Sequence, residues 1–185
     1  GPELSEATRR VLEATGVEPR WFRPPFGISS YASLKVAREL GMTTVLWTTW
    51  GRDWRREATP DTVVADVVKT LERTRLALIT GPSACGKTSL VEAGVVAALR
   101  AVSGPLEYAR LVVGDVPLAS IEEALERQSS TVTGRHLLFI DQVERLLRHS
   151  SIADVRRFLE RVGGAAARPG GPLLILAIRD ARVSE

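Results

Sequence analysis

The chain has 185 residues, of which 44% are apolar, which is enough to form one ordinary domain, or a small domain with an appended piece, around a real core. Its net charge of +3 comes with scattered arginines and no long block of like charges, so nucleic-acid binding has weak support. The single cysteine, Cys85, excludes an internal disulfide, and no apolar run is long enough to span a bilayer.

The first part of the chain, residues 1–72, is predicted to alternate between helix and strand. Gly16 and Gly41 mark the ends of two helices, Ser29 or Ser30 caps the second, and Thr59 caps a third that has a proline in its first turn. The expected elements are a helix at 4–15, a short apolar segment at 21–22, a helix at 30–40, a strand at 43–49 and a helix at 61–71.

The second part, residues 73–185, has continuous apolar strands between amphipathic helices. The expected strands are 76–79, 108–113, 137–140 and 173–178, and the expected helices are 87–101, 118–128, 144–148 and 152–162, followed by a flexible glycine-rich segment at 163–171. This alternation is typical of a parallel sheet covered by helices on both faces. The sequence therefore predicts an α/β fold of P-loop NTPase type.

A glycine-rich loop, Gly81-Pro82-Ser83-Ala84-Cys85-Gly86-Lys87-Thr88, joins the first of these strands to its helix. Its glycines let successive backbone N–H groups point at phosphates, and the start of the helix adds positive potential. In such a loop the lysine reaches the β- and γ-phosphates and the threonine hydroxyl ligates magnesium. The predicted nucleotide-binding residues are Gly81, Ser83, Ala84, Cys85, Gly86, Lys87, Thr88 and Ser89.

Asp141 ends an apolar strand, and we expect it at the tip of a strand neighbouring the loop, where it would hold magnesium through water. The alternative role for this aspartate is a helix cap. Either Gln142 or Glu144 can orient the attacking water, and Glu144 is the preferred catalytic base, with an ordinary surface carboxylate as the alternative. Arg179 ends the fourth strand, where it either senses the γ-phosphate or pairs with Asp180.

The second part resembles the STAND class of signal-transduction ATPases. The resemblance covers about 75–185 and rests on the loop with its continuation Ser89-Leu90-Val91-Glu92-Ala93-Gly94, on Leu138-Phe139-Ile140-Asp141-Gln142-Val143-Glu144-Arg145-Leu146-Leu147 and on Ala177-Ile178-Arg179-Asp180. It implies a switch that binds ATP and hydrolyses it slowly. Members of the class continue with a fifth strand, a helical lid and often a winged helix, which we expect to lie outside this sequence. We expect surfaces for protein partners or self-association to lie in those regions as well.

The first part resembles the C-terminal half of NodB-type polysaccharide deacetylases, which are zinc enzymes with a distorted barrel. The resemblance covers about 3–72 and rests on residues 21–27 and 46–54. It implies that Arg23 orients a catalytic aspartate and that Trp54 lines the acetyl pocket. The family's Thr-Phe-Asp-Asp-Gly-Pro segment and His-x-x-x-His pair are absent, and Leu78-Ile79-Thr80 stands where its last motif reads Leu-x-His. We therefore expect no zinc hydrolysis, and interpret the chain as a chimera.

The sequence predicts an ATP- and Mg²⁺-binding domain, with slow hydrolysis as an open question. The alternatives are an inactive deacetylase-related fragment and a non-enzymatic scaffold or interaction module. A nucleoside triphosphate is the expected partner, with no strong nucleic-acid signal and no membrane segment. ATP use and the single cysteine predict a cytoplasmic location. The sequence does not decide between ATP and GTP.

Overall fold

The computed structural model describes residues 2–24, 29–45, 57–114, 118–127 and 135–179. Its contacts divide the chain into two compact units, Gly1–Trp50 and Gly51–Glu185. No helix within the described ranges combines the length and the hydropathy that crossing a membrane requires.

The first unit contains two helices and two short parallel strands. These elements are α1 (Pro2–Thr15), β1 (Trp21–Phe22), α2 (Tyr31–Glu39) and β2 (Thr43–Thr44). The N–H of Gly16, with a φ of 69°, donates to the carbonyl of Leu12 and ends α1, as the sequence predicts. Ser30, one of the two expected caps, accepts from the backbone N–H of Ser33 at the start of α2. Of the strand expected at 43–49, residues 46–49 lie outside the described ranges.

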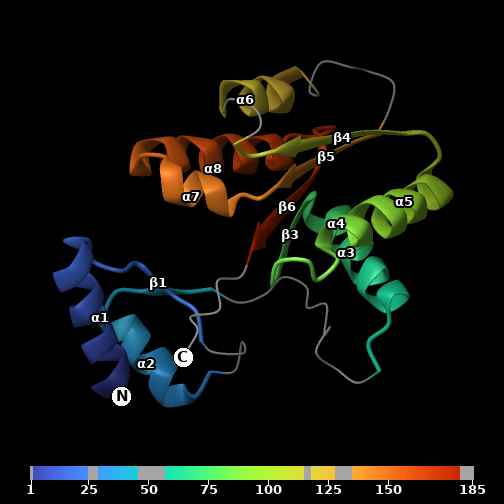
Figure 1. Cartoon of the computed structure of the whole chain (residues 1–185). Helices are drawn as coiled ribbons and strands as arrows, with labels where there is room; N and C mark the ends of the chain where they lie inside the picture. Colours follow the sequence, from blue (N-terminus) through green and yellow to red (C-terminus); the bar gives the residue numbers. More distant parts are fainter. Residues whose placement is uncertain (1, 25–28, 46–56, 115–117, 128–134, 180–185) are drawn as a thin grey trace. The chain divides into compact units, whose positions relative to one another are not determined.

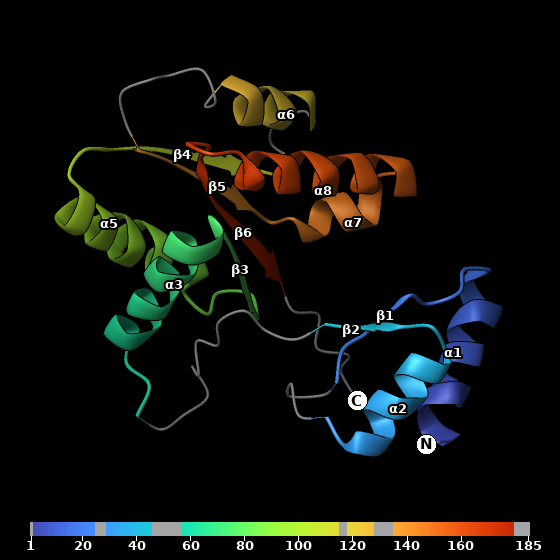
Figure 2. The same ribbon diagram turned by 180° about the vertical axis from the view of Figure 1, so that it is seen from behind.

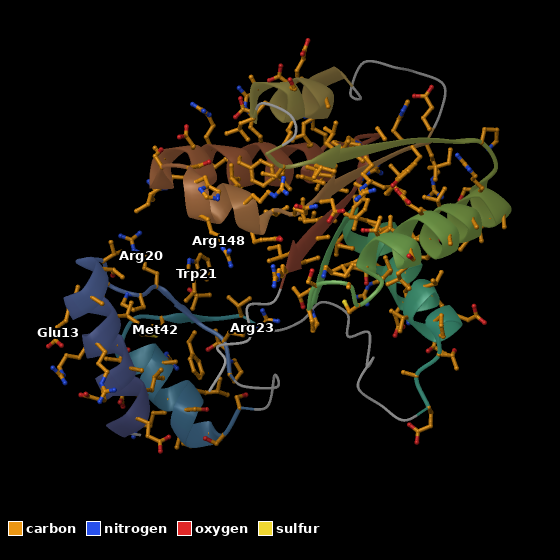
Figure 3. The ribbon with its side chains drawn as sticks, viewed as in Figure 1. Glu13, Arg20, Trp21, Arg23, Met42 and Arg148 are labelled. Carbon is orange, nitrogen blue, oxygen red and sulfur yellow. The ribbon has the colours of Figure 1, made fainter. Side chains whose placement is uncertain are left out.

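The first unit buries few large side chains among the residues described. Ala37 on α2 and Met42, just before β2, are buried, whereas Trp21 on β1 is 69% exposed (Figure 3). Exposed ion pairs along α1, such as Arg9 with Glu6, contribute little to stability because water screens them. The described part of this unit therefore has only a small core.

The second unit is a four-stranded parallel sheet with helices on both faces (Figure 1). Its elements are α3 (Pro60–Thr74), β3 (Leu76–Gly81), α4 (Lys87–Ser89), the π-helical turn η2 (Leu90–Val95), α5 (Val96–Ser103), β4 (Leu106–Val112), α6 (Leu118–Arg127), β5 (Arg135–Asp141), α7 (Glu144–His149), α8 (Ile152–Ala167) and β6 (Leu173–Arg179). The strand order is β3-β6-β5-β4, and every pair is parallel. The predicted α/β class and parallel sheet are confirmed.

Alternate residues of the central strands point to opposite faces and enter two separate cores, because side chains alternate along a strand. On one face Phe139 and Ile175 pack with α3, η2 and α5. On the other face Ile140 and Leu174 pack with α6, α7 and α8. Figures 1 and 2 show these two groups of helices on opposite sides of the sheet. The continuous apolar strands are explained by this burial on both faces.

Helix α3 packs in the second unit, although the sequence analysis placed it in the first part. Its apolar side includes the buried Leu71 and the partly buried Val64, which pack with η2 and α5. A Cβ added at Gly94 in η2 would lie 2.4 Å from Cγ2 of Val64, so the glycine permits this close approach. The contacts divide the chain between residues 50 and 51, whereas the sequence predicts a boundary between residues 72 and 73.

The flexible segment expected at residues 163–171 is mostly helical. Helix α8 runs through Gly163 and Gly164 to Ala167 and buries Val162 and Ala165 on the sheet. The two glycines lower helix propensity, but the burial of the apolar side on either side of them outweighs this cost. The prediction was therefore wrong for the first half of the segment.

Candidate functional site

The glycine-rich loop connects β3 to α4 at the C-terminal edge of the sheet. Ala84 and Gly86 have φ angles of 61° and 88°, so the backbone reverses through two left-handed residues before the helix begins. No side chain caps α4 at Gly86, which leaves the first N–H groups of the helix without a capping side chain. A loop of this geometry can present several backbone donors to an anion.

Lys87 is folded back onto the loop that precedes it. Its Nζ donates to the carbonyl oxygens of Gly81 at 2.8 Å and Pro82 at 2.7 Å, and lies 3.8 Å from Sγ of Cys85. These contacts satisfy the ammonium group with neutral acceptors. The charge of Lys87 therefore lies against two carbonyl oxygens and a thiol of the loop.

Thr88 and Asp141 meet although 53 residues separate them. Oγ1 of Thr88 donates to Oδ2 of Asp141 at 3.2 Å. The two residues come from α4 and from the end of β5. The sequence predicts Asp141 on a strand neighbouring the loop, but β6 lies between β3 and β5. Asp141 nevertheless reaches Thr88 because α4 lies over the edge of the sheet where the strands end.

Asp141 is a buried carboxylate, 5% exposed, with partners on both oxygens. The backbone N–H of Gln142 donates to its Oδ1 at 2.9 Å. Nη2 of Arg110 pairs with its Oδ2 at 2.7 Å. A buried charge needs such partners because water does not solvate it. Asp141 therefore orients toward Thr88 through side-chain contacts, and the cap position of α7 is Val143, with no side chain capping the helix there.

Arg110 on β4 and Glu92 on η2 belong to this cluster, and neither is among the site residues predicted from the sequence. Nη1 of Arg110 lies 3.5 Å from Oε1 of Glu92, and the hydroxyl of Tyr108 donates to the same oxygen at 3.2 Å. The guanidinium lies over the ring of Phe139, 5.8 Å from its centroid. The available signal was the charged Arg110 two positions after Tyr108 in a strand, because such a spacing places both side chains on one face of the sheet.

These contacts shift two pKa values. Burial raises the pKa of Tyr108, and the neighbouring charge of Glu92 raises it further. Burial lowers the pKa of Arg110, but the hydrogen bond and charge of Asp141 and the charge of Glu92 raise it by more, so its net pKa is raised. Arg110 therefore stays a cation and Tyr108 stays a neutral phenol near neutral pH.

The candidate catalytic residues gather where β5 and β6 end. Oε2 of Glu144, the first residue of α7, accepts from the backbone N–H of Arg179 at 2.9 Å. Gln142 has a φ of 59°, which is uncommon for a residue other than glycine. Asp180, the alternative partner of Arg179, lies outside the described residues. The structure thus joins Glu144 to Arg179 through the backbone.

The chemistry of Thr88 and Asp141 fits magnesium and does not fit zinc. A hydroxyl and a carboxylate are oxygen ligands, and Mg²⁺ usually takes one or two such protein ligands beside phosphate oxygens and water. The described residues contain no group of three or more histidine, cysteine, aspartate and glutamate side chains that could hold a metal alone. Among the deacetylase-like positions, Arg23 follows β1, and Trp54 lies outside the described residues.

The family described as novel STAND NTPase 1 matches residues 59–184, which is more than half of the chain. The chain belongs to this family. The matched range begins just before α3 and includes every element of the sheet. It confirms the resemblance to the STAND class, and the second unit is a P-loop NTPase domain.

The polysaccharide deacetylase family matches residues 2–45, so the predicted combination of two families in one chain is confirmed. The chain is also 36% identical over 56 residues to the uncharacterized protein YlxY of Bacillus subtilis (strain 168). That similarity covers 30% of this chain and 18% of YlxY. The chain therefore spans only a small share of that relative.

Three solved structures are similar to part of this chain at low sequence identity. PCH-2 of C. elegans has a TM-score of 0.47 at 18% identity, covering 65% of this chain and 35% of that one. The HORMA:CdnC:Trip13 complex of E. coli MS115-1 has a TM-score of 0.44 at 18% identity, and the similarity covers 71% of this chain and 50% of that one. The ORC2 protein of Aeropyrum pernix, in ADPNP and ADP complexes, has a TM-score of 0.45 at 15% identity, and the similarity covers 65% of this chain and 40% of that one.

Proposed function

We propose that the second unit binds ATP with Mg²⁺ and hydrolyses it slowly. The observation that carries this proposal is the 3.2 Å hydrogen bond between Thr88 and Asp141, which joins the hydroxyl after the loop lysine to the carboxylate at the end of β5. The loop supplies backbone donors for the phosphates. The family match to a class of NTPases supports the same ligand.

In this proposal Lys87 leaves the carbonyls of Gly81 and Pro82 and pairs with the β- and γ-phosphates. Residues 83–86 and Ser89 would surround the phosphates, and Thr88 and Asp141 would hold the magnesium ion. Magnesium supplies charge neutralisation for the phosphates and the leaving group. The exchange of neutral acceptors for phosphate oxygens makes the interactions of Lys87 stronger, because both partners are then charged.

For hydrolysis, Glu144 accepts a proton from a water molecule that attacks the γ-phosphorus. The bond from that phosphorus to the β–γ bridging oxygen breaks, and ADP and inorganic phosphate leave. The backbone N–H of Arg179 donates to Glu144, which places the two residues side by side. The side chain of Arg179 would contact the γ-phosphate. Gln142 is the alternative residue for orienting the water.

Titration with a fluorescent ATP analogue in the presence of Mg²⁺ tests the binding. We expect Lys87→Ala to weaken binding about 10- to 100-fold, because it removes charged hydrogen bonds to the phosphates. Lys69→Ala, which removes an exposed lysine of α3, is the matched control and should bind as the unmodified chain does. Equal binding by the two variants would refute the proposal. Competition of the analogue with ATP and with GTP would show which nucleotide is preferred.

Phosphate release tests the hydrolysis. We expect Glu144→Gln to lower the rate about 100-fold while the analogue binds unchanged, because the amide cannot accept the proton. Gln142→Ala separates Glu144 from Gln142 as the residue that orients the water. A larger loss of the phosphate-release rate in this variant than in Glu144→Gln would assign that role to Gln142. A chain that binds the analogue without releasing phosphate would be a binding module.

ATP as the ligand supports a cytoplasmic location for this domain, which we include in the proposal. We propose no deacetylase activity for the residues matched to that family. A scaffold without a nucleotide site is the remaining alternative, and normal folding with no rise in melting temperature on adding Mg²⁺ and ATP would favour it.

A further inference from the structure

Arg110 contacts the same carboxylate oxygen that lies beside Thr88. Oδ2 of Asp141 accepts from Oγ1 of Thr88 at 3.2 Å and from Nη2 of Arg110 at 2.7 Å. If Thr88 and Asp141 hold magnesium, a guanidinium and a divalent cation would compete for this one oxygen. Two cations on one oxygen repel each other, so full pairing with both is unfavourable.

The second partner of Arg110 offers it another position. Its Nη1 already lies 3.5 Å from Oε1 of Glu92, which the Tyr108 hydroxyl contacts at 3.2 Å. The Asp141 side chain is 7% exposed, whereas those of Arg110 and Glu92 are 33% and 43% exposed. The buried carboxylate is therefore fixed, and the two more exposed groups have freedom to rearrange.

We propose that Arg110 is an exchangeable counter-ion of Asp141, which neutralises this carboxylate in the nucleotide-free protein and moves fully onto Glu92 when Mg²⁺ binds. The inference rests on the proposed function, because it assigns Asp141 to the metal. The ring of Phe139, 5.8 Å from the guanidinium carbon, underlies the cation. Arg110 thereby keeps a charged partner in both states, and the empty site avoids an unpaired buried charge.

The Mg²⁺ concentration that gives half-maximal binding of the fluorescent ATP analogue is the measurement that tests this. Arg110→Gln removes the competing cation, so we expect the half-saturating Mg²⁺ concentration to fall about tenfold. Glu92→Gln removes the second acceptor and retains Arg110 on Asp141, so we expect that concentration to rise several-fold. These opposite directions distinguish counter-ion exchange from a general loss of structure.

Arg157→Gln is the matched control, because Arg157 pairs with Glu122 at 3.0 Å between α8 and α6, on the other face of the sheet. It should leave the Mg²⁺ dependence unchanged. An unchanged or higher Mg²⁺ requirement for Arg110→Gln would overturn the proposal. Loss of analogue binding by that variant in EDTA would also overturn it, because Arg110 would then be a phosphate ligand.

Nucleotide-free protein separates this inference from the proposed function. Mn²⁺ binding, followed by electron paramagnetic resonance without nucleotide, should be tighter for Arg110→Gln than for the unmodified chain. If the unmodified chain binds no ATP analogue at any Mg²⁺ concentration, the proposed function fails, and the Mn²⁺ comparison still decides the inference. If Arg110→Gln does not fold, Arg110→Lys replaces it: we expect a smaller fall in the Mg²⁺ requirement, and no fall would overturn the proposal.

Discussion

Gln142 shows how one residue is held in an unfavourable conformation beside a functional group. Its φ of 59° costs free energy for a side chain with a Cβ, and its N–H donates to Oδ1 of Asp141 at 2.9 Å. The N–H of Val143 then donates to the carbonyl of Ala177 on β6. The left-handed residue thus turns the chain so that it both orients the carboxylate and joins β5 to β6.

Gln142→Gly should relieve this backbone strain. We expect the free energy of unfolding to stay the same or rise by up to about 1 kcal/mol, whereas Gln142→Val should lower it by about 1–2 kcal/mol because a β-branched residue resists positive φ. Urea unfolding of both variants measures the difference. Equal stability of the glycine and valine variants would show that the conformation carries no strain.

Tyr108 connects the stability of the chain to alkaline pH. Its pKa in the folded chain is raised above the unfolded value of about 10, so the contribution of the neutral phenol is complete below about pH 10 and is lost as pH rises through the folded-state pKa. We expect the urea midpoint of the unmodified chain to fall more steeply above about pH 10 than that of Tyr108→Phe. Parallel curves for the two proteins would contradict this.

At the scale of elements, the contact between α3 and η2 is set by one glycine. The π-helical turn places Gly94 against Val64, where a Cβ would overlap Cγ2 at 2.4 Å. Valine has one strongly preferred rotamer in a helix and cannot easily turn this methyl away. The loop, α4 and η2 are continuous in the chain, so this contact also fixes the helix that follows the phosphate-binding loop.

Gly94→Ala should lower the free energy of unfolding by about 1–3 kcal/mol, because the added methyl overpacks the interface. Val64→Ala removes the opposing methyls, so the double variant should recover part of that loss and show a coupling free energy of about 1 kcal/mol. Chemical denaturation of the two single variants and the double variant completes this cycle. Strictly additive effects would show that the two residues do not meet.

At the scale of the whole molecule, two units that match different families share one chain. The first unit matches a deacetylase family at residues 2–45 and has a small described core, whereas the second unit has two cores on one sheet. Three of the four tryptophans, at positions 21, 47 and 50, belong to the first unit, and the fourth, at position 54, falls near the start of the second. Tryptophan fluorescence therefore reports mainly on the first unit, while circular dichroism reports mainly on the second unit.

Saturating Mg²⁺ and ATP should stabilise only the second unit. We expect the thermal midpoint by circular dichroism to rise by about 10 °C at about 100 times the dissociation constant, while the midpoint by tryptophan fluorescence rises by much less, because three of the four tryptophans belong to the first unit. Lys87→Ala should show neither shift. Equal shifts by both probes would show that the two units unfold together.

The sequence by itself determined what is local or periodic. The loop from Gly81 to Thr88, the cap at Thr59, a cap at Ser29 or Ser30 and the apolar strands were predictable, because each depends on neighbouring residues or on one repeat of hydrophobicity. The same local rules failed at Gly163 and Gly164, where burial of the neighbouring apolar residues holds the helix together.

Only the tertiary structure decided the strand order and the charges around Asp141. The insertion of β6 between β3 and β5, and the meeting of Arg110, Glu92 and Asp141, depend on which strands and helices lie side by side. No sequence spacing encodes such contacts, because the three residues come from three separate elements. The phosphate-binding loop was thus predictable from its own residues, whereas the counter-ion of its neighbouring carboxylate was not.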